Sequence, residues 1–171
     1  AVGYAALENN DSSGTGVAIN NTAVGHQALN ANTTGDENTA VGYQSLYNAT
    51  ASRTTAIGYQ ALYANTGLHN TAVGWSSLLN NSTGNDNTAL GYRALEDNLD
   101  GSLNTAIGAH AMDSSTGSSN NNNTALGYNA LRNNQGESNT ASGYQALTAN
   151  TTGNYNTASG YEALSFNTTG N

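Results

Sequence analysis

Residues 38–46 read NTAVGYQSL, and nine further copies or partial copies of this motif recur along the chain. Their central glycines lie 16 to 22 residues apart, at Gly3, Gly25, Gly42, Gly58, Gly74, Gly91, Gly108, Gly127, Gly143 and Gly160. Self-similarity at a short, nearly constant period is the signature of a repeat architecture. The motif therefore dominates any prediction of the fold.

Each position of the motif accepts a narrow set of residues. Alanine stands two residues before the glycine in all ten copies, and threonine precedes that alanine in all nine complete copies. Asparagine comes before the threonine in eight of these nine, an aromatic residue follows the glycine in eight of ten, and leucine stands four residues after it in nine. The residue two positions after the glycine varies freely, so we expect it to face water.

A period of about 17 residues is too short for a helical hairpin repeat, but it fits one coil of a parallel β-solenoid. We therefore predict an all-β fold: a parallel β-solenoid, or β-roll, of about ten coils with two or three short strands in each. Residues 1–171 would form a single array, and because both ends fall within a repeat we expect an excerpt of a longer fibre. Coils would stack at the strand spacing of about 4.8 Å, which places like residues on like residues.

Columns of identical side chains would hold such coils together. We expect asparagine amides to pair along the axis, leucine to fill an inner corner, and aromatic rings to stack. The invariant alanine and glycine would mark places where two backbones approach closely. Representative members of these structural ladders are Asn70, Thr71, Ala72, Gly74, Leu78, Tyr92, Leu95, Asn104, Tyr144 and Leu147.

A second glycine, as in Gly35, Gly67, Gly84 and Gly153, lies between motifs and usually follows a threonine. We predict a turn there, since glycine reaches positive φ without steric cost. Residues 48–54 lack this glycine, so the turn in that coil must be built differently.

The composition is short of large core residues. Asn (29), Ala (26), Thr (22) and Gly (20) exceed half of the 171 residues, whereas Leu, Ile, Val and Phe together number 24. One coil of this sequence hardly offsets an ordering cost of roughly 1–2 kcal/mol per residue. Packing three solenoids around a common axis would supply the missing burial, so we predict a homotrimer.

Short strands such as Thr55-Ala56-Ile57-Gly58, Thr71-Ala72-Val73-Gly74 and Thr105-Ala106-Ile107-Gly108, with Val17-Ala18-Ile19 out of phase, resemble the head repeats of trimeric autotransporter adhesins. The fuller NTAVGYQAL…NTTG form is also similar to repeats of phage tail fibres. The resemblance implies a left-handed parallel β-roll, a homotrimer and an extracellular adhesive fibre. The period is longer than that of the usual adhesin head, and residues 1–171 contain no stretch that resembles the neck, stalk or anchor of that family.

The charge balance excludes several partners. Three arginines and no lysine stand against eleven carboxylates, for a net charge of −8. A chain of this charge cannot neutralise a phosphate backbone, so we expect no nucleic acid. No apolar run reaches the roughly 18 residues of a spanning helix, so we expect no membrane insertion by this segment.

Nothing in the sequence points to catalysis. The three histidines, His26, His69 and His110, occupy different positions of the repeat, and no nucleophile–base–orienter set is apparent. Acidic residues at the turns, Asp36, Glu37, Asp86 and Glu137, supply oxygens that calcium prefers, but they do not lie in adjacent coils, and we expect solvated turns. We therefore predict no enzyme, no cofactor and no metal site.

Sequons at Asn32, Asn150 and Asn167 allow N-glycosylation, although such triplets arise by chance in a repeat rich in Asn and Thr.

Two functions follow from this interpretation. The first is a structural and adhesive segment of an extracellular fibre, on a cell surface or a virion. Its partners would be copies of itself and a host-surface glycan or protein. The polar residue after each aromatic residue, together with the loops at 8–16 and 113–122, would carry this recognition. The second is a monomeric ice-binding solenoid that presents the threonine column as a flat face. Oligomeric state and ice shaping would separate the two.

Overall fold

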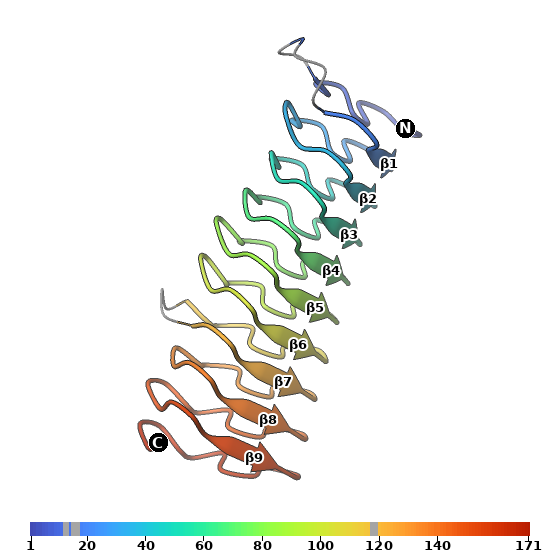
Figure 1. The fold of residues 1–171 in the computed structure, drawn as a ribbon. Coiled ribbons are helices and arrows are strands. Elements are labelled where there is room, and N and C mark those ends of the chain that lie inside the picture. The colour runs from blue at the N-terminus through green and yellow to red at the C-terminus, as the bar shows by residue number, and fades with distance from the viewer. Residues whose placement is uncertain (12–13, 15–17, 117–119) are drawn as a thin grey trace.

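The computed structural model describes residues 1–11, 14, 18–116 and 120–171 of the chain. These residues form a straight rod of stacked coils, with the two termini at opposite ends (Figure 1). The prediction of an all-β parallel solenoid is confirmed. Nine three-residue strands form one parallel sheet in sequence order: β1 (Thr22–Val24), β2 (Thr39–Val41), β3 (Thr55–Ile57), β4 (Thr71–Val73), β5 (Thr88–Leu90), β6 (Thr105–Ile107), β7 (Thr124–Leu126), β8 (Thr140–Ser142) and β9 (Thr157–Ser159).

The strands pair in register, so that the repeat position of every strand residue matches that of its partner. Thr71 pairs with Thr88, Ala72 with Ala89 and Val73 with Leu90, and the other strand pairs follow the same rule. The first copy of the motif joins the sheet only through an isolated bridge between Val2 and Val24. Each strand contacts only its neighbours, as expected of a solenoid.

Each described coil contains one strand rather than the two or three expected. Backbone hydrogen bonds nevertheless join the coils outside the strands: Leu78 donates its N–H to the carbonyl of Ala94 in the next coil, and Gln145 donates to Tyr128 in the preceding one. The residues two and four after the motif glycine have φ near +50 to +56° in every copy. Backbone in this left-handed region leaves the β conformation, so the ladder continues without further strands.

These left-handed residues were not foreseen, because glycine is the usual occupant of such positions and none of these is glycine. The inner member is leucine or Met112, and the outer members include Gln44 (φ 51°) and Arg93 (φ 55°). The outer position does not simply face water either. Gln44 and Gln60 are half-buried and joined by an amide hydrogen bond of 2.9 Å, and Ser76 is buried.

The core is a narrow double column of small and branched side chains. Ala72 of the strand, Ala94 and the leucines Leu78, Leu95 and Leu147 are fully buried, and their equivalents in neighbouring coils form one continuous cluster. One leucine (Met112 in one coil) and two alanines, or one alanine and one serine, thus form the apolar part of the interior in each inner coil. The shortage of large residues reflects the thinness of the rod.

Both glycine columns lie where the backbones of adjacent coils approach so closely that a side chain would collide with the next coil. Gly74 has φ of +141°, and a Cβ at this position would lie well inside 3.0 Å of the backbone of Gly91. The corner glycine Gly84 differs from our expectation, since its φ is not positive. A Cβ there would instead collide with the carbonyl of Gly101 and the side chain of Asn81. The corner therefore requires glycine for space and not for its dihedral angles.

The coil at residues 48–54 shows how the corner is built without glycine. Ala51 takes the place of the corner glycine: Asn38 Nδ2 donates to its carbonyl at 2.7 Å, as Asn70 Nδ2 donates to that of Gly84 at 2.8 Å. Thr54 takes the place of the column asparagine, and its N–H donates to Asn38 Oδ1.

Candidate interaction surface

The outer face of the sheet carries two of the three columns that define the candidate surface. In every strand the central alanine points into the rod, while the threonine and the third residue lie on the outside, as the alternation of a β-strand requires. The third residue is aliphatic in β1–β7 and serine in β8 and β9: Val24, Val41, Ile57, Val73, Leu90, Ile107, Leu126, Ser142 and Ser159. Leu90 and Leu126 are 46% and 48% exposed, respectively.

The third column is aromatic, and in most coils its residue directly follows the motif glycine. It consists of ten rings in sequence: Tyr4, His26, Tyr43, Tyr59, Trp75, Tyr92, His110, Tyr128, Tyr144 and Tyr161. Tyr43 and Tyr59 stack with ring centroids 5.2 Å apart and planes 8° apart. Because the rings cover one another's faces along most of the column, mainly their edges are exposed, and the column is not a platform on which a sugar ring could stack.

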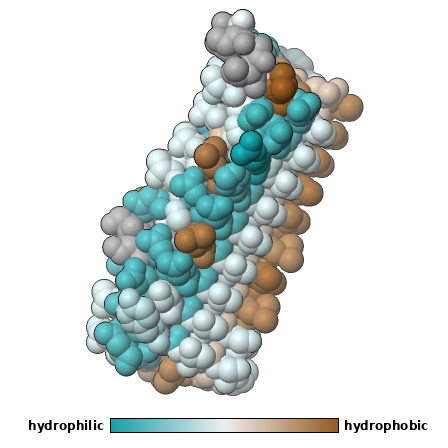
Figure 2. All heavy atoms as spheres, viewed as in Figure 1, coloured by the Kyte–Doolittle hydropathy of each residue, from teal (hydrophilic) through white to brown (hydrophobic). Residues whose placement is uncertain are grey.

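The three columns together are called the strand-face stripe below. Figure 2 shows hydrophobic side chains in a row along the edge of the rod where Figure 1 places the strands. No Asp, Glu, Lys or Arg occurs in any of the three columns. Depletion of charged residues distinguishes the centre of a protein interface from ordinary surface.

The stripe is large enough to support association. Its tyrosines, Ile57, Leu90 and Leu126 are about 40–48% exposed along the middle of the rod, whereas Val41, Val73 and Ile107 are half-buried. With side-chain areas of 150–250 Å² for aromatic residues, the stripe offers on the order of 1,000 Å² per chain, which exceeds the ~800 Å² that each partner of a stable complex commonly buries.

A cluster of ionisable side chains adjoins the stripe where the aromatic column is interrupted. Ala109 replaces the aromatic residue in that coil, and the ring of His110 fills the gap, edge-on to Tyr92 and Tyr128. His110 Nδ1 lies 2.7 Å from Oδ2 of the buried Asp113.

Two arginines of the flanking coils complete this cluster. Arg93 Nε and Arg132 Nε lie 3.8 and 3.7 Å from the Asp113 carboxylate. Arg93 also pairs with Glu96 through a hydrogen bond. Burial raises the pKa of Glu96 despite this bond, and Asp113 adds a smaller upward contribution. The described coils enclose no pocket here, so we interpret the cluster as packed structure and not as a binding cavity.

The asparagine ladders are buried. Asn70 Oδ1 accepts the backbone N–H of Asn87 at 2.9 Å, and Asn87 Oδ1 accepts that of Asn104 at 3.0 Å, while the Nδ2 groups donate to backbone carbonyls of the next coil. In this column the side chains bond mainly to backbone, and not to one another as we expected. Thr71 is half-buried beside it, and Tyr92 and Tyr144 are exposed.

A second buried asparagine column went unrecognised in the sequence. Asn81 Nδ2 donates to Asn65 Oδ1 at 2.6 Å, and Asn98 Nδ2 donates to Asn81 Oδ1 at 2.9 Å. This column carries the amide-to-amide pairing that was expected of the first. Its signal was available: asparagine stands seven residues after the motif glycine in most copies.

The asparagines of the sequons at Asn32, Asn150 and Asn167 are members of this second column. Asn32 and Asn150 are fully buried, and their Nδ2 atoms donate to Asn10 and Asn134, respectively. Asn167 is half-buried and donates to Asn150. A glycan replaces a hydrogen of Nδ2, so the folded coil is incompatible with glycosylation at Asn32 or Asn150.

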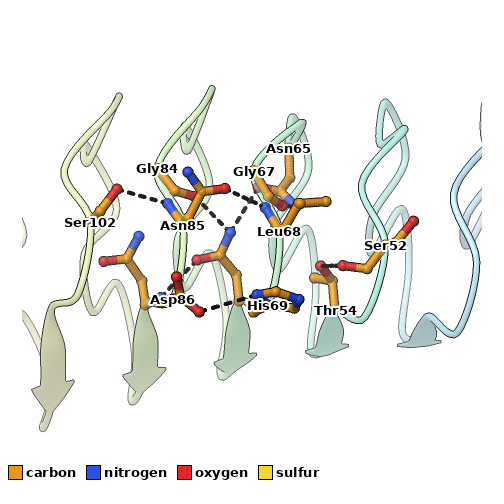
Figure 3. Close-up of polar contacts among 12 residues, drawn as sticks. Ser52, Thr54, Asn65, Gly67, Leu68, His69, Gly84, Asn85, Asp86 and Ser102 are labelled. Atoms are coloured by element: carbon orange, nitrogen blue, oxygen red, sulfur yellow. Dashed lines mark hydrogen bonds and ion pairs between the residues drawn. The ribbon is translucent and has the colours of Figure 1, made fainter.

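Two of the four turn acids each pair with one basic residue of an adjacent coil. Glu37 contacts Arg53 at 2.9 Å. Asp86 contacts His69 at 3.2 Å, and Figure 3 shows this second pair. Leu68 and Asn85 join the same corners through a hydrogen bond of 2.7 Å. Within the described ranges no three His, Asp or Glu side chains come together as a metal site would require. Of the two loops expected to contribute to recognition, residues 12–13, 15–17 and 117–119 lie outside the described residues, as does Val17 of the strand-like stretch 17–19.

No protein-family model, curated protein or solved structure matches the chain. In the part of the chain that the structure describes, no helix is long and apolar enough to cross a membrane.

Proposed function

We propose that the chain is a structural segment of an extracellular fibre, exposed on a cell surface or a virion, and that copies of it associate through the strand-face stripe as a homotrimer. The observation that carries this proposal is the stripe itself: an uncharged, largely apolar surface that runs the length of the rod while the charged side chains lie elsewhere. The proposal assigns the chain no catalytic step.

Association of copies accounts for residues that one rod leaves without a role. Val, Ile or Leu at the third strand position contributes nothing to the interior of the rod, where alanine alone points inward. An apolar residue repeated over seven coils at a position that is exposed or half-buried is expected where another surface covers it. The coils of a second copy repeat at the same spacing, so the side chains of the two stripes would match each other coil by coil.

We place any adhesive contact with a host-surface glycan or protein at the corner of the coil that directly precedes each strand. There the residue two before the strand threonine differs from coil to coil, as in Glu37, Arg53, His69 and Leu103. Variation of this kind gives the rod a chemically distinct surface at each level, which a recognition surface needs and a self-packing surface does not.

The test uses two leucines of equal exposure. Leu90 lies on the stripe and is 46% exposed, and Leu99 lies on a corner and is 47% exposed. We expect analytical ultracentrifugation to give three times the chain mass for the wild type and for Leu99→Asp, and a single chain for Leu90→Asp. A monomeric wild type over a wide concentration range would refute the association.

A second candidate function uses the same face. Nine threonines lie in register on β1–β9, spaced by adjacent parallel strands about 4.8 Å apart. A flat, regular array of hydroxyl and methyl groups is what an ice-binding surface requires. Because a trimer would cover this face, ice shaping is expected only from a monomeric chain. A monomer that leaves ice crystals unshaped would exclude this candidate.

A further inference from the structure

Four pairs of tyrosines stack between adjacent coils. In the aromatic column the pairs are Tyr43 with Tyr59, Tyr128 with Tyr144 and Tyr144 with Tyr161, with centroids 5.2, 5.4 and 5.1 Å apart. The fourth pair, Tyr47 with Tyr63, lies four residues further along the coil, with centroids 5.3 Å apart and planes 11° apart.

The remaining tyrosines have no such partner. Tyr4 stacks on His26, and Tyr92 lies between Trp75 and His110. Tyr155 is 71% exposed at a corner and makes no ring contact among the described residues. The chain thus contains seven tyrosines in stacked pairs and three that serve as internal controls.

We propose that the stacked pairs are sites of oxidative modification, at which a one-electron oxidant converts tyrosines of adjacent coils into dityrosine. Each phenol loses one electron and its hydroxyl proton to give a phenoxyl radical. The two radicals join through their Cε carbons, the displaced ring hydrogens leave as protons, and both hydroxyl groups are restored. In sum, two tyrosines give one cross-link, two protons and two electrons, and the electrons reduce two equivalents of the oxidant.

The geometry favours coupling within the pairs. Parallel strands hold the two backbones about 4.8 Å apart, so the second phenol is already beside the first when it is oxidised. Tyr43, Tyr59, Tyr128 and Tyr144 are 40–44% exposed in a single chain, which leaves part of each ring open to a dissolved oxidant. Tyr47 and Tyr63 lie outside the strand-face stripe, so association of copies does not cover this pair.

Each cross-link would tie one coil to the next over 16 or 17 residues of chain. A covalent link of this kind stabilises the fold mainly by restricting the unfolded chain. We therefore expect oxidised rods to unfold at a higher temperature than untreated rods.

The experiment oxidises the dilute chain with photogenerated tris(bipyridyl)ruthenium(III), with persulfate as the final electron acceptor. Dityrosine is followed by its blue fluorescence, and linked peptides are identified by the loss of two hydrogen atoms. Because Tyr144 couples only once, at most three links form per chain. We expect Tyr63→Phe, which breaks the pair outside the strand-face stripe, to lose at least about a third of the dityrosine, and Tyr155→Phe, the matched control, to lose none.

Two results would overturn the proposal. One is the appearance of Tyr4, Tyr92 or Tyr155 in cross-links as often as the paired residues. The other is the absence of dityrosine under conditions that couple free N-acetyltyrosine. Circular dichroism of both variants before oxidation checks that the coils are intact.

Discussion

His110 Nδ1 lies 2.7 Å from Asp113 Oδ2, and this contact fixes an imidazole ring in the one coil where alanine interrupts the aromatic column. The carboxylate is buried and faces the guanidinium groups of two neighbouring coils. Side chains of three successive coils therefore meet at the Asp113 carboxylate.

Replacement of that carboxylate tests the arrangement. Asp113→Asn keeps the shape of the side chain but removes the charge opposite Arg93, His110 and Arg132, and we expect a loss of about 1–3 kcal/mol in the free energy of unfolding. Asp86→Asn breaks only the exposed pair with His69, and its expected cost is below about 0.5 kcal/mol. Chemical denaturation of both variants makes the comparison, and equal costs would contradict it.

Each asparagine side chain of the first column must both donate and accept a hydrogen bond. Asn104 accepts the backbone N–H of Asn123 and donates to the carbonyl of Asn120 at 2.7 Å, and all three groups are buried. Asn104→Ala leaves two buried backbone groups unpaired, and Asn104→Asp loses the donor, so each should cost at least about 2 kcal/mol. Asn80→Ala, which removes an exposed contact with Asp97, serves as the control and should cost little.

The two glycine columns should respond differently to alanine. Gly74→Ala combines a φ of +141° with a collision against the backbone of Gly91, and we expect a loss of about 3 kcal/mol or more. Gly84→Ala faces the collision without the dihedral strain, and Ala51 shows that one coil accommodates this methyl group. Thermal unfolding should therefore rank Gly74→Ala well below Gly84→Ala, and the reverse order would refute the assignment.

The left-handed residues offer a stabilising change. Leu103 is 56% exposed with φ of +61°, where asparagine is tolerated better than leucine. We expect Leu103→Asn to raise the free energy of unfolding by about 0.5–1 kcal/mol. Leu99 is similarly exposed but is not in this conformation, so Leu99→Asn should bring no such gain.

The repeat predicted the architecture because strict recurrence at a period of about 17 residues has few structural solutions. Its register follows from the same strictness: Thr71 on Thr88 is the only alignment in which every column matches. The number of strands per coil could not be obtained this way. It depends on left-handed backbone at Leu78 and Ser76, residue types that ordinarily give no sign of it.

The interaction surface was less accessible to sequence reasoning. Alternation in a three-residue strand shows that Ala72 and Val73 point in opposite directions, but not which of them faces inward. Alanine faces inward because it is small, since the coil is too thin for a second branched residue beside Leu78. The His110 cluster could not be foreseen, because it joins residues of three coils around a side chain that leaves its own column.

Because each strand contacts only its neighbours and pairs with them in the same register, one coil is structurally nearly equivalent to another. A gene encoding such a chain can gain or lose whole repeats by unequal recombination and still specify a seamless rod. Length thereby becomes a heritable quantity that varies in steps of one coil, about 4.8 Å, while cross-section and side-chain spacing stay constant.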